Sequence, residues 1–470
     1  MRWLVWVAAL ALPPLAMILS SDAGVAVRLA AALLVSLPLG LWVAIRAPLV
    51  MYRLFAVVLG ALPFGTLPGF PLPLVLLLGV SIGATAIVQL PQQRKDAPFT
   101  ALEWAAVVLI VVSAASMLVN LTSGFDVSEF AKWLIATSAL LSLGRLNASA
   151  IRTVGRSFVV GSAAAAVFAL VLLVFDPSGS RLSLLSFFGY GTTGDDNLRY
   201  VFDASGATVR LTGTYVDPNI GGLFLFVALL LAMACFRGVL RIGFVALLGV
   251  SMALTLSRAA IFSTLVAILV LFAVQNLTFG KKLRVFTVLA VGASALLLIP
   301  AVQNRLLASF GKFDRGSTDR VDALRDFPKL MDGHWLFGLG WGRLEFRDSA
   351  AGIAVNYVAN SPLLTVYRGG VIVGLAFVAL LIVALIASWR GLRSGNLGLG
   401  VVGAGFVGFA AVALQVDFPV VTIPPVTALF SLLLAVLPRS QDPPGLSSST
   451  PQVEELPTQQ LTGAHGGSRG

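Results

Sequence analysis

The sequence predicts an all-α, polytopic integral membrane protein with about 12–14 transmembrane helices and two long outer loops. Of its 470 residues, 58% are hydrophobic and 11% are charged, and the mean hydropathy is +0.94. A soluble protein of this length would need far more polar surface. The net charge of +11 comes from small basic clusters at the ends of apolar runs, which indicates membrane topology. We therefore expect contact with membrane lipids and no nucleic-acid partner.

The chain offers few residues for thiol or metal chemistry. Cys235 is its one cysteine, so no intramolecular disulfide can form, and only His334 and His465 are histidines. We expect neither a metal site nor a bound cofactor.

Apolar runs of helical length define about fourteen candidate spans. They are residues 3–20, 24–44, 52–66, 70–90, 101–119, 128–144, 156–175, 218–236, 241–256, 258–276, 284–302, 362–388, 396–416 and 419–437. The first run could also be read as a signal peptide, since Arg2 precedes it and small residues follow near Ser20. Because the rest of the chain is itself membrane-embedded, we expect this first span to be retained.

Basic residues in alternate loops predict the orientation of the spans. The loops that would be inner contain Arg46, Arg53, Arg94, Lys95, Arg145, Arg152, Arg156, Arg237, Arg241, Lys281, Lys282, Arg284, Arg390, Arg393 and Arg439. The short loops that would be outer contain Asp22, Asp126 and Asp417, with little that is basic except Arg258. This bias predicts that both termini are cytoplasmic.

The same reading divides the chain into six parts. They are an N-terminal transmembrane bundle (1–175), an outer loop (176–217), central transmembrane helices (218–302), a large outer loop with an amphipathic helix (303–361), C-terminal transmembrane helices (362–437) and a disordered cytoplasmic tail (438–470). Long polar loops in a compact membrane protein are usually functional or disordered. The two outer loops could therefore form a site or serve as tethers, and the Pro-, Ser- and Gly-rich tail is typical of disorder.

Arg258 is the only charged residue between Gly243 and Gln275. One helix over that stretch would be about 50 Å long, against a bilayer core of about 30 Å. We expect two spans instead, with the turn at Ser257 and Arg258. Ser257 would cap a helix whose positive end carries an arginine, an arrangement that makes sense if an anion such as phosphate binds there. Alternatively, Arg258 reaches the outer lipid headgroups.

A second outward-facing helix start is predicted at Asp217, Pro218 and Asn219. Asp217 suits an N-cap, and Pro218 suits the first helical position, where its missing N–H costs nothing. The pattern is equally compatible with an ordinary well-made helix start. Asp217 and Asn219 could also hold sugar hydroxyls.

Arg320 in the second long loop is the third candidate. It begins an amphipathic stretch that ends at Gly340, and we expect this stretch to lie on the membrane surface with its arginine over the site. Arg315 is a weaker candidate, and either arginine could be a solvated charge.

These segments, in this order and on one predicted face, resemble the signature of the bacterial O-antigen ligase and O-antigen (Wzy-type) polymerase family. The resemblance covers roughly residues 205–385 and combines Gly213–Asn219, Ser257–Ala260, Arg320–Gly340, Asn360–Leu363 and Tyr367–Gly374. No single motif is strong, but their order and spacing together are fairly specific.

The resemblance implies a C-type membrane glycosyltransferase that uses a glycan carried on a polyprenyl diphosphate at the outer face of the cell's inner (cytoplasmic) membrane. In the family, the arginines that match Arg258 and Arg320 are thought to bind the donor diphosphate. We add Asp217 as a catalytic candidate. The substrate-binding candidates are Arg210, Tyr215, Asn219, Ser257, Arg315, Asn360 and Tyr367. Other polysaccharide-assembly membrane proteins are further candidate partners.

One departure from the family pattern favours a polymerase over a ligase. Ligases have a histidine, proposed to activate the acceptor hydroxyl, where this chain has Ala359. Asp217, Asp322 and Glu345 then remain as candidates for the base. The alternatives are ligase-like transfer of a finished glycan to a lipid or wall acceptor, or a lipid-linked oligosaccharide flippase or transporter. The low number of charges within the spans disfavours a transporter.

Overall fold

The computed structural model describes most of the predicted helical regions. The described residues are 42–43, 45–67, 70–89, 99–176, 180–191, 200–203, 206–275, 324–325, 327–343, 360–416 and 420–437, with a few isolated positions. The chain divides into two units, Met1–Pro438 and Arg439–Gly470, and every described residue belongs to the first. The predicted tail lies outside the described residues, as do the predicted spans 3–20 and 284–302 and nearly all of 24–44, apart from isolated positions.

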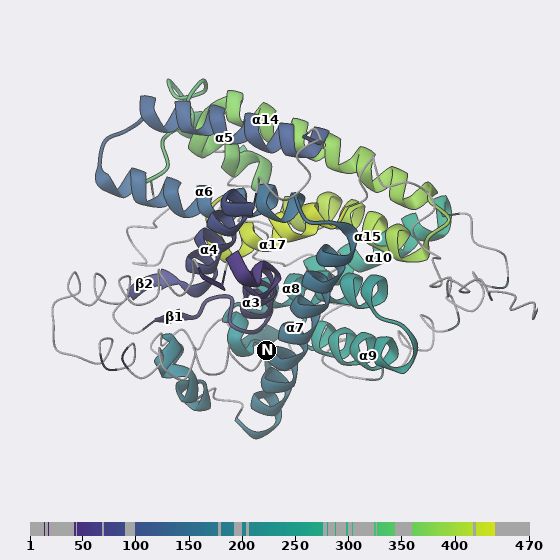
Figure 1. Ribbon diagram of the computed structural model, residues 1–470. Coiled ribbons are helices and arrows are strands. Elements are labelled where there is room, and N and C mark those ends of the chain that lie inside the picture. Colours follow the sequence, from purple (N-terminus) through teal and green to yellow (C-terminus); the bar gives the residue numbers. More distant parts are fainter. Residues whose placement is uncertain are drawn as a thin grey trace, which may run out of the picture. The chain divides into compact units, whose positions relative to one another are not determined.

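Helices form almost all of the described structure (Figure 1). They are α3 (Pro48–Ala61), α4 (Leu74–Gln89), α5 (Ala101–Val119), α6 (Gly124–Gly144), α7 (Ala148–Phe175), α8 (Pro218–Cys235), α9 (Gly238–Leu254), α10 (Arg258–Val274), α14 (Ser361–Arg393), α15 (Leu397–Gly408), α16 (Leu414–Val416) and α17 (Pro424–Ala435). Two short 3₁₀ segments, η1 (Ser180–Phe188) and η3 (Gly213–Tyr215), and a π-helical turn, η4 (Phe409–Ala413), complete the helical elements.

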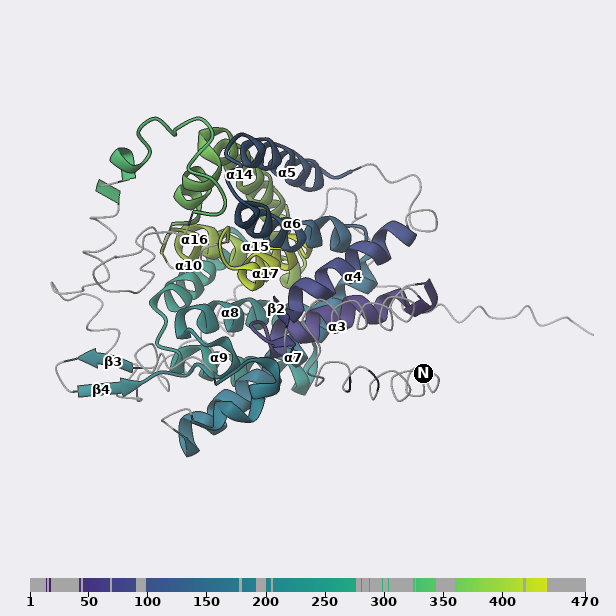
Figure 2. The same cartoon turned by 90° about the vertical axis from the view of Figure 1, so that its left-hand side faces the viewer.

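Two small antiparallel hairpins lie outside the helices. β1 (Thr66–Leu67) pairs with β2 (Phe70–Pro73), and β3 (Tyr200–Asp203) pairs with β4 (Gly206–Val209). In β3–β4 the register joins Tyr200 to Val209 and Asp203 to Gly206, and the two strands run side by side (Figure 2). The predicted outer loop 176–217 therefore contains local structure.

The mostly helical class predicted from the sequence is confirmed. α5, α7, α8 and α14 are long and apolar enough to cross a membrane, and the other apolar helices are shorter. These helices support the assignment to membrane proteins. The number of spans and the side on which each terminus lies stay predictions.

The helix boundaries differ from the predicted spans where capping residues outweigh hydropathy. α7 starts at Ala148, before the predicted 156, because the Asn147 side chain accepts a hydrogen bond from the backbone N–H of Ala150. Charged residues such as Arg152 hid this first stretch from a reading based on apolar runs. The predicted span 396–416 contains the π-helical turn η4, which periodicity did not predict.

α8 lies at the centre of the packing. It contacts α7, α9, α10 and α15, with smaller contacts to α17 and η3. Its residues from Leu223 to Ala228 are fully buried. A helix that is apolar on every face is stable only when other helices cover it, so α8 fixes the positions of its neighbours.

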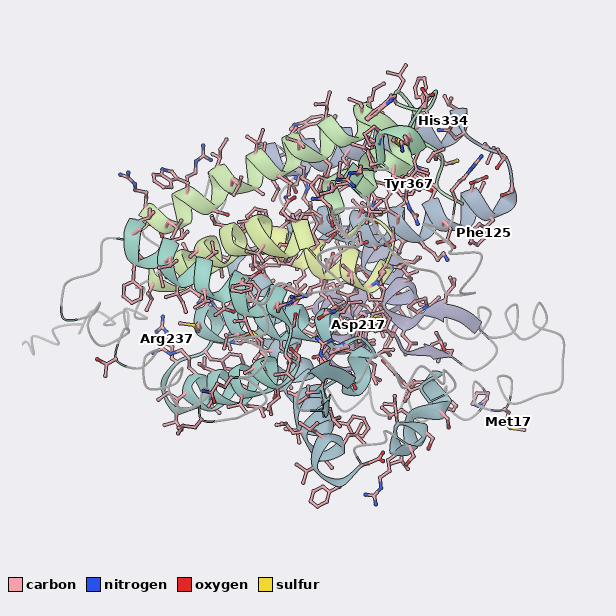
Figure 3. All side chains as sticks on the ribbon, turned by 180° about the vertical axis from the view of Figure 1, so that it is seen from behind. Met17, Phe125, Asp217, Arg237, His334 and Tyr367 are labelled. Atoms are coloured by element: carbon pink, nitrogen blue, oxygen red, sulfur yellow. The ribbon has the colours of Figure 1, made fainter. Side chains whose placement is uncertain are left out.

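Contacts at the two ends of α8 show which parts of α3 and α7 lie beside each end. At its start, the Asp217 end, the Tyr215 hydroxyl donates to the carbonyl of Gly60 at the end of α3, at 3.1 Å. At its other end, the Arg237 end, Nε of Arg156 near the start of α7 donates to the carbonyl of Cys235, at 2.9 Å. Figure 3 shows Asp217 and Arg237 well separated. The basic residues Arg156 and Arg237 thus lie at the same end of α8.

A break inside α14 is covered by another part of the chain. Gly370 has φ of +77° and ψ of 179°, which interrupts the helix. The segment Met331–Gly342, which we name the clasp, crosses this break. The N–H groups of Leu339 and Gly340 donate to the carbonyls of Tyr367 and Arg368, at 2.8 and 3.1 Å. The clasp thereby satisfies carbonyl groups that the break deprives of helical partners.

The clasp belongs to the loop that was predicted to contain a surface-lying amphipathic helix. The described end of that stretch packs on protein, because Phe327 and Met331 form a small buried cluster with Leu364 and Tyr367 of α14. Placement on the membrane surface remains a prediction for the earlier residues, which lie outside the described part of the chain.

Replacing Gly370 with alanine should destabilise the fold. The backbone conformation there is one that glycine alone adopts readily, with a cost of about 2 kcal/mol for other residues, and a Cβ would overlap the carbonyl of Leu336. We expect Gly370→Ala to lower the thermal midpoint in detergent. The matched control is Gly243→Ala in α9, where a Cβ meets nothing within 4 Å. Equal midpoints for both variants would contradict the proposed role of the break.

Candidate functional site

The two predicted helix starts are both present and both capped as expected. Asp217 is the N-cap of α8, and its Oδ1 accepts hydrogen bonds from the N–H groups of Asn219 and Ile220, at 2.6 and 3.1 Å. Ser257 is the N-cap of α10, and its Oγ accepts from the N–H of Ala260 at 3.4 Å. The predicted turn that divides the apolar stretch is therefore confirmed.

Strained backbone precedes each of these starts. Among the described residues, Val216 and Leu256 are the non-glycine residues with positive φ, at 62° and 53°. Val216 lies directly before the N-cap Asp217, and Leu256 directly before the N-cap Ser257. A β-branched residue with positive φ is a genuine outlier, and such strain persists only where the surrounding structure enforces it. Strain of this kind concentrates at functional sites.

Arg210 joins the two helix starts. Its Nε donates to the carbonyl of Thr255 at 2.8 Å, and its Nη2 donates to Oδ1 of Asn219 at 2.6 Å. The side chain is buried, with 7% exposed. One guanidinium thus binds the first turn of α8 and the residue three positions before the start of α10. We name this pair of helix starts, together with Arg210, the junction.

The backbones of the two starts also approach closely. The N–H of Leu211 donates to the carbonyl of Leu254 at 3.0 Å. A Cβ placed on Gly222 would lie only 2.6 Å from Cβ of Ser257. Glycine at position 222 therefore allows the α8 helix to pack directly against the turn before α10.

Arg258 differs from Arg210 in its exposure. Arg258 is half-buried at the first position of α10, between the buried residues Ser257 and Ala259. An arginine at a helix N-terminus is unfavourably placed relative to the helix dipole unless negative charge lies nearby. Arg258 and the partly exposed Asp217 and Asn219 are thus the polar side chains that this junction presents at its surface.

Tyr215 is placed to support the site from within. It is fully buried, its ring lies 5.4 Å from that of Phe224, and its hydroxyl donates to Gly60. These contacts connect η3 to α3 and α8. Direct binding of a ligand by Tyr215, as the sequence suggested, would require the ring to leave this packing.

Asn360 and a residue not singled out from the sequence form an amide pair. Asn360 caps α14 through Oδ1, which accepts from the N–H of Leu363 at 3.0 Å, and its Nδ2 donates to Oε1 of Gln415 at 2.7 Å. Gln415 follows the π-helical turn η4 and is exposed. π-helical turns are frequent at functional sites.

The amide pair lies toward the same end of the structure as Arg258. α10 and α15 run antiparallel, since a Cβ on Gly400 would overlap the Gln275 side chain near the end of α10, and one on Gly408 would overlap the Ser263 carbonyl. Beyond Gly408, the chain continues through η4 to Gln415, and α10 followed back from Ser263 leads to its start at Arg258. Gln415 and Arg258 therefore lie toward the same end of these two helices. The sequence signal for Gln415 was a lone amide near the end of an apolar run.

The remaining predicted site residues lie elsewhere. Tyr367 is buried beneath the clasp with Phe327 and Met331, near His334 in the view of Figure 3. The other candidates, in the predicted loop 303–361, are outside the described residues: Arg315, Arg320, Asp322, Glu345 and Ala359. Thr255, whose carbonyl binds Arg210, was missed because a backbone acceptor leaves no sequence signal.

Comparison with known proteins gives no family assignment. Neither the models of known protein families nor the curated proteins include a match to this chain. Within the described ranges, no group of three or more His, Cys, Asp or Glu side chains is placed to hold a metal ion.

The two arginines at this junction should respond differently to substitution. Arg210→Ala removes a buried charged donor and leaves its acceptors on Thr255 and Asn219 without it, which should lower the free energy of unfolding by about 3 kcal/mol. Arg258→Ala, at a half-buried position, should change it by less than about 1 kcal/mol. Thermal unfolding of both variants in the same detergent tests this contrast, and a greater loss for Arg258→Ala would refute it.

Proposed function

We propose that this protein is a membrane glycosyltransferase that polymerises polysaccharide repeat units from a polyprenyl-diphosphate-linked donor. The observation that carries the proposal is the junction itself: a half-buried Arg258 at one capped helix start, fixed beside a second capped start by Arg210. The family resemblance of residues 205–385 supplies the reaction class. The outer face of the cytoplasmic membrane is its proposed location.

The junction has the donors that a diphosphate requires. The first turn of an α-helix has N–H groups without acceptors inside the helix, and these groups with an arginine make an anion-binding site. Arg258 lies at the first position of α10. Placed beside the departing diphosphate, its guanidinium would stabilise the charge that develops as the glycosidic bond breaks. Arg320 is proposed, from the resemblance alone, as a second arginine for the same diphosphate.

Asp217 is the proposed base at the junction. One of its oxygens, Oδ1, accepts both of its capping hydrogen bonds, and the residue is partly exposed. In the proposed reaction, the acceptor hydroxyl oxygen forms a bond to the anomeric carbon while the bond from that carbon to the diphosphate oxygen breaks. The hydroxyl proton passes to the Asp217 carboxylate, and the diphosphate leaves with the bonding electron pair.

The amide pair supplies a place for sugar hydroxyls. Asn360 and Gln415 donate and accept through their amide groups, and Gln415 is exposed. Amides suit hydroxyl groups because they offer both a donor and an acceptor. We assign the pair to binding of the glycan.

Arg258→Ala and Arg258→Lys should both stop glycan chain growth while the protein stays inserted and abundant. Lysine keeps the charge but cannot bind a diphosphate through two parallel N–H groups. The measurement is the length of lipid-linked glycan made by each purified variant. Arg237→Lys, at the opposite end of α8, is the matched control and should give normal polymer. Normal chain length in both Arg258 variants would sink the proposed diphosphate site.

Supplying the purified protein with lipid-linked repeat units alone separates polymerisation from ligation. A polymerase should produce longer lipid-linked chains, since one repeat unit serves as acceptor for another. A product that forms only after an unrelated lipid or wall acceptor is added would identify a ligase and contradict the proposed polymerase.

A further inference from the structure

Asp126, at the start of α6, accepts an unusually complete set of hydrogen bonds. Its Oδ2 accepts from the N–H and hydroxyl groups of Thr122 and Ser123, at 2.8 to 3.1 Å. Its Oδ1 accepts from the N–H of Gly342 in the clasp, at 2.7 Å. Burial by itself would raise the pKa of Asp126, but these hydrogen bonds outweigh it and lower the pKa to about 2.

The two carboxylate oxygens therefore have separate tasks. Oδ2 caps its own helix through Thr122 and Ser123, which is local and would be sufficient to begin α6. Oδ1 binds a residue 216 positions away in sequence. The local capping role does not require that second contact, and Gly342 fits closely against the carboxylate because it has no Cβ.

Two other helices hold the clasp as well. The carbonyl of Phe337 accepts from Oγ of Ser116 and Nδ2 of Asn120, both near the end of α5, at 2.8 and 2.6 Å. The N–H of Val371, just after the break in α14, donates to the carbonyl of Trp335 at 2.8 Å. α5 and α14 run alongside each other (Figure 1). The clasp thus fastens the end of α5 and the start of α6 to α14 at its break.

The break in α14 makes this attachment important for the amide pair. Residues Ser361–Gly369 precede the break at Gly370, so continuous helical hydrogen bonding does not fix their direction relative to the rest of α14. The clasp binds this first segment through Tyr367 and Arg368. Asn360, bonded to Gln415, caps the segment.

We propose that Asp126 is a positioning residue for glycan binding: through Gly342 it holds the clasp, and through the clasp it sets the first segment of α14 and Asn360. This inference rests on the proposed function for its kinetic consequence. Its structural part, the attachment of the clasp by Asp126, is independent of the reaction.

Two substitutions break the contact from opposite sides. Asp126→Ala removes the acceptor. Gly342→Ala places a Cβ where it overlaps Oδ1 and leaves Asp126 in the sequence. In a protein that already carries Asp126→Ala, the Gly342→Ala change should add little, because the overlapping oxygen is gone and the next atom is the Asp126 backbone nitrogen at 3.0 Å. Thr122→Val is the matched control, since it removes only a bond to Oδ2.

Hydrogen exchange of residues 331–343 in the full-length protein reports on the attachment. We expect exchange to be about tenfold faster or more in each single variant, the size expected for a lost hydrogen bond to a charged group. The double variant should match Asp126→Ala, and Thr122→Val should leave the exchange rate close to that of the unchanged protein. Unchanged exchange in both single variants would overturn the attachment.

Kinetics then test positioning against general loss of structure. With a fixed lipid-linked polymer as donor and single lipid-linked repeat units as acceptor, both single variants should raise the KM for the acceptor about tenfold at nearly unchanged kcat. A loss of folded enzyme would lower kcat at constant KM and would overturn the positioning role. If the unchanged protein makes no polymer, the proposed function fails. The hydrogen-exchange measurement still tests whether Asp126 holds the clasp, because it does not depend on the reaction.

Discussion

The hydrogen bonds from Arg210 to Thr255 and Asn219 hold together two helix starts that are far apart in sequence. A buried guanidinium is costly to desolvate, so its donors must be satisfied, and both of these acceptors lie on the elements that the site needs. Arg258 stands at the first position of α10, which packs beside α8, and is half-buried where Arg210 is buried. The rest of the site depends on this arrangement, in which the buried Arg210 holds the two helix starts together and the half-buried Arg258 is the proposed ligand of the diphosphate.

The second feature on which the fold depends is close packing of backbone segments at glycine residues. Gly222 lets α8 meet the turn before α10, and Gly342 lets the clasp meet Asp126. Strained residues, Val216 and Leu256, occur directly before the two N-caps. Apolar packing around the buried helix α8 must supply the free energy that maintains this strain, because no local interaction favours positive φ at valine or leucine.

Much of this arrangement could be predicted from the residues themselves. The apolar runs predicted the helices, and the pattern of Asp217, Pro218 and Ser257 predicted both N-caps, because capping depends on local chemistry. The bond from Arg210 to Thr255 and the clasp could not be predicted. The first depends on a backbone carbonyl, and the second depends on contacts between residues more than a hundred positions apart, such as Asp126 with Gly342. The break at Gly370 was hidden for a related reason: a glycine in an apolar run also fits a continuous helix.

Binding of a short polyprenyl diphosphate, farnesyl diphosphate, to the purified protein in detergent tests the central claim that Arg258 and the paired helix starts form a diphosphate site. Affinity should be at least about tenfold weaker for Arg258→Ala, the size expected for lost hydrogen bonds to a charged group. Farnesol, which has the same chain and no diphosphate, should not compete. Equal affinity of the unchanged protein and Arg258→Ala for farnesyl diphosphate would contradict the account.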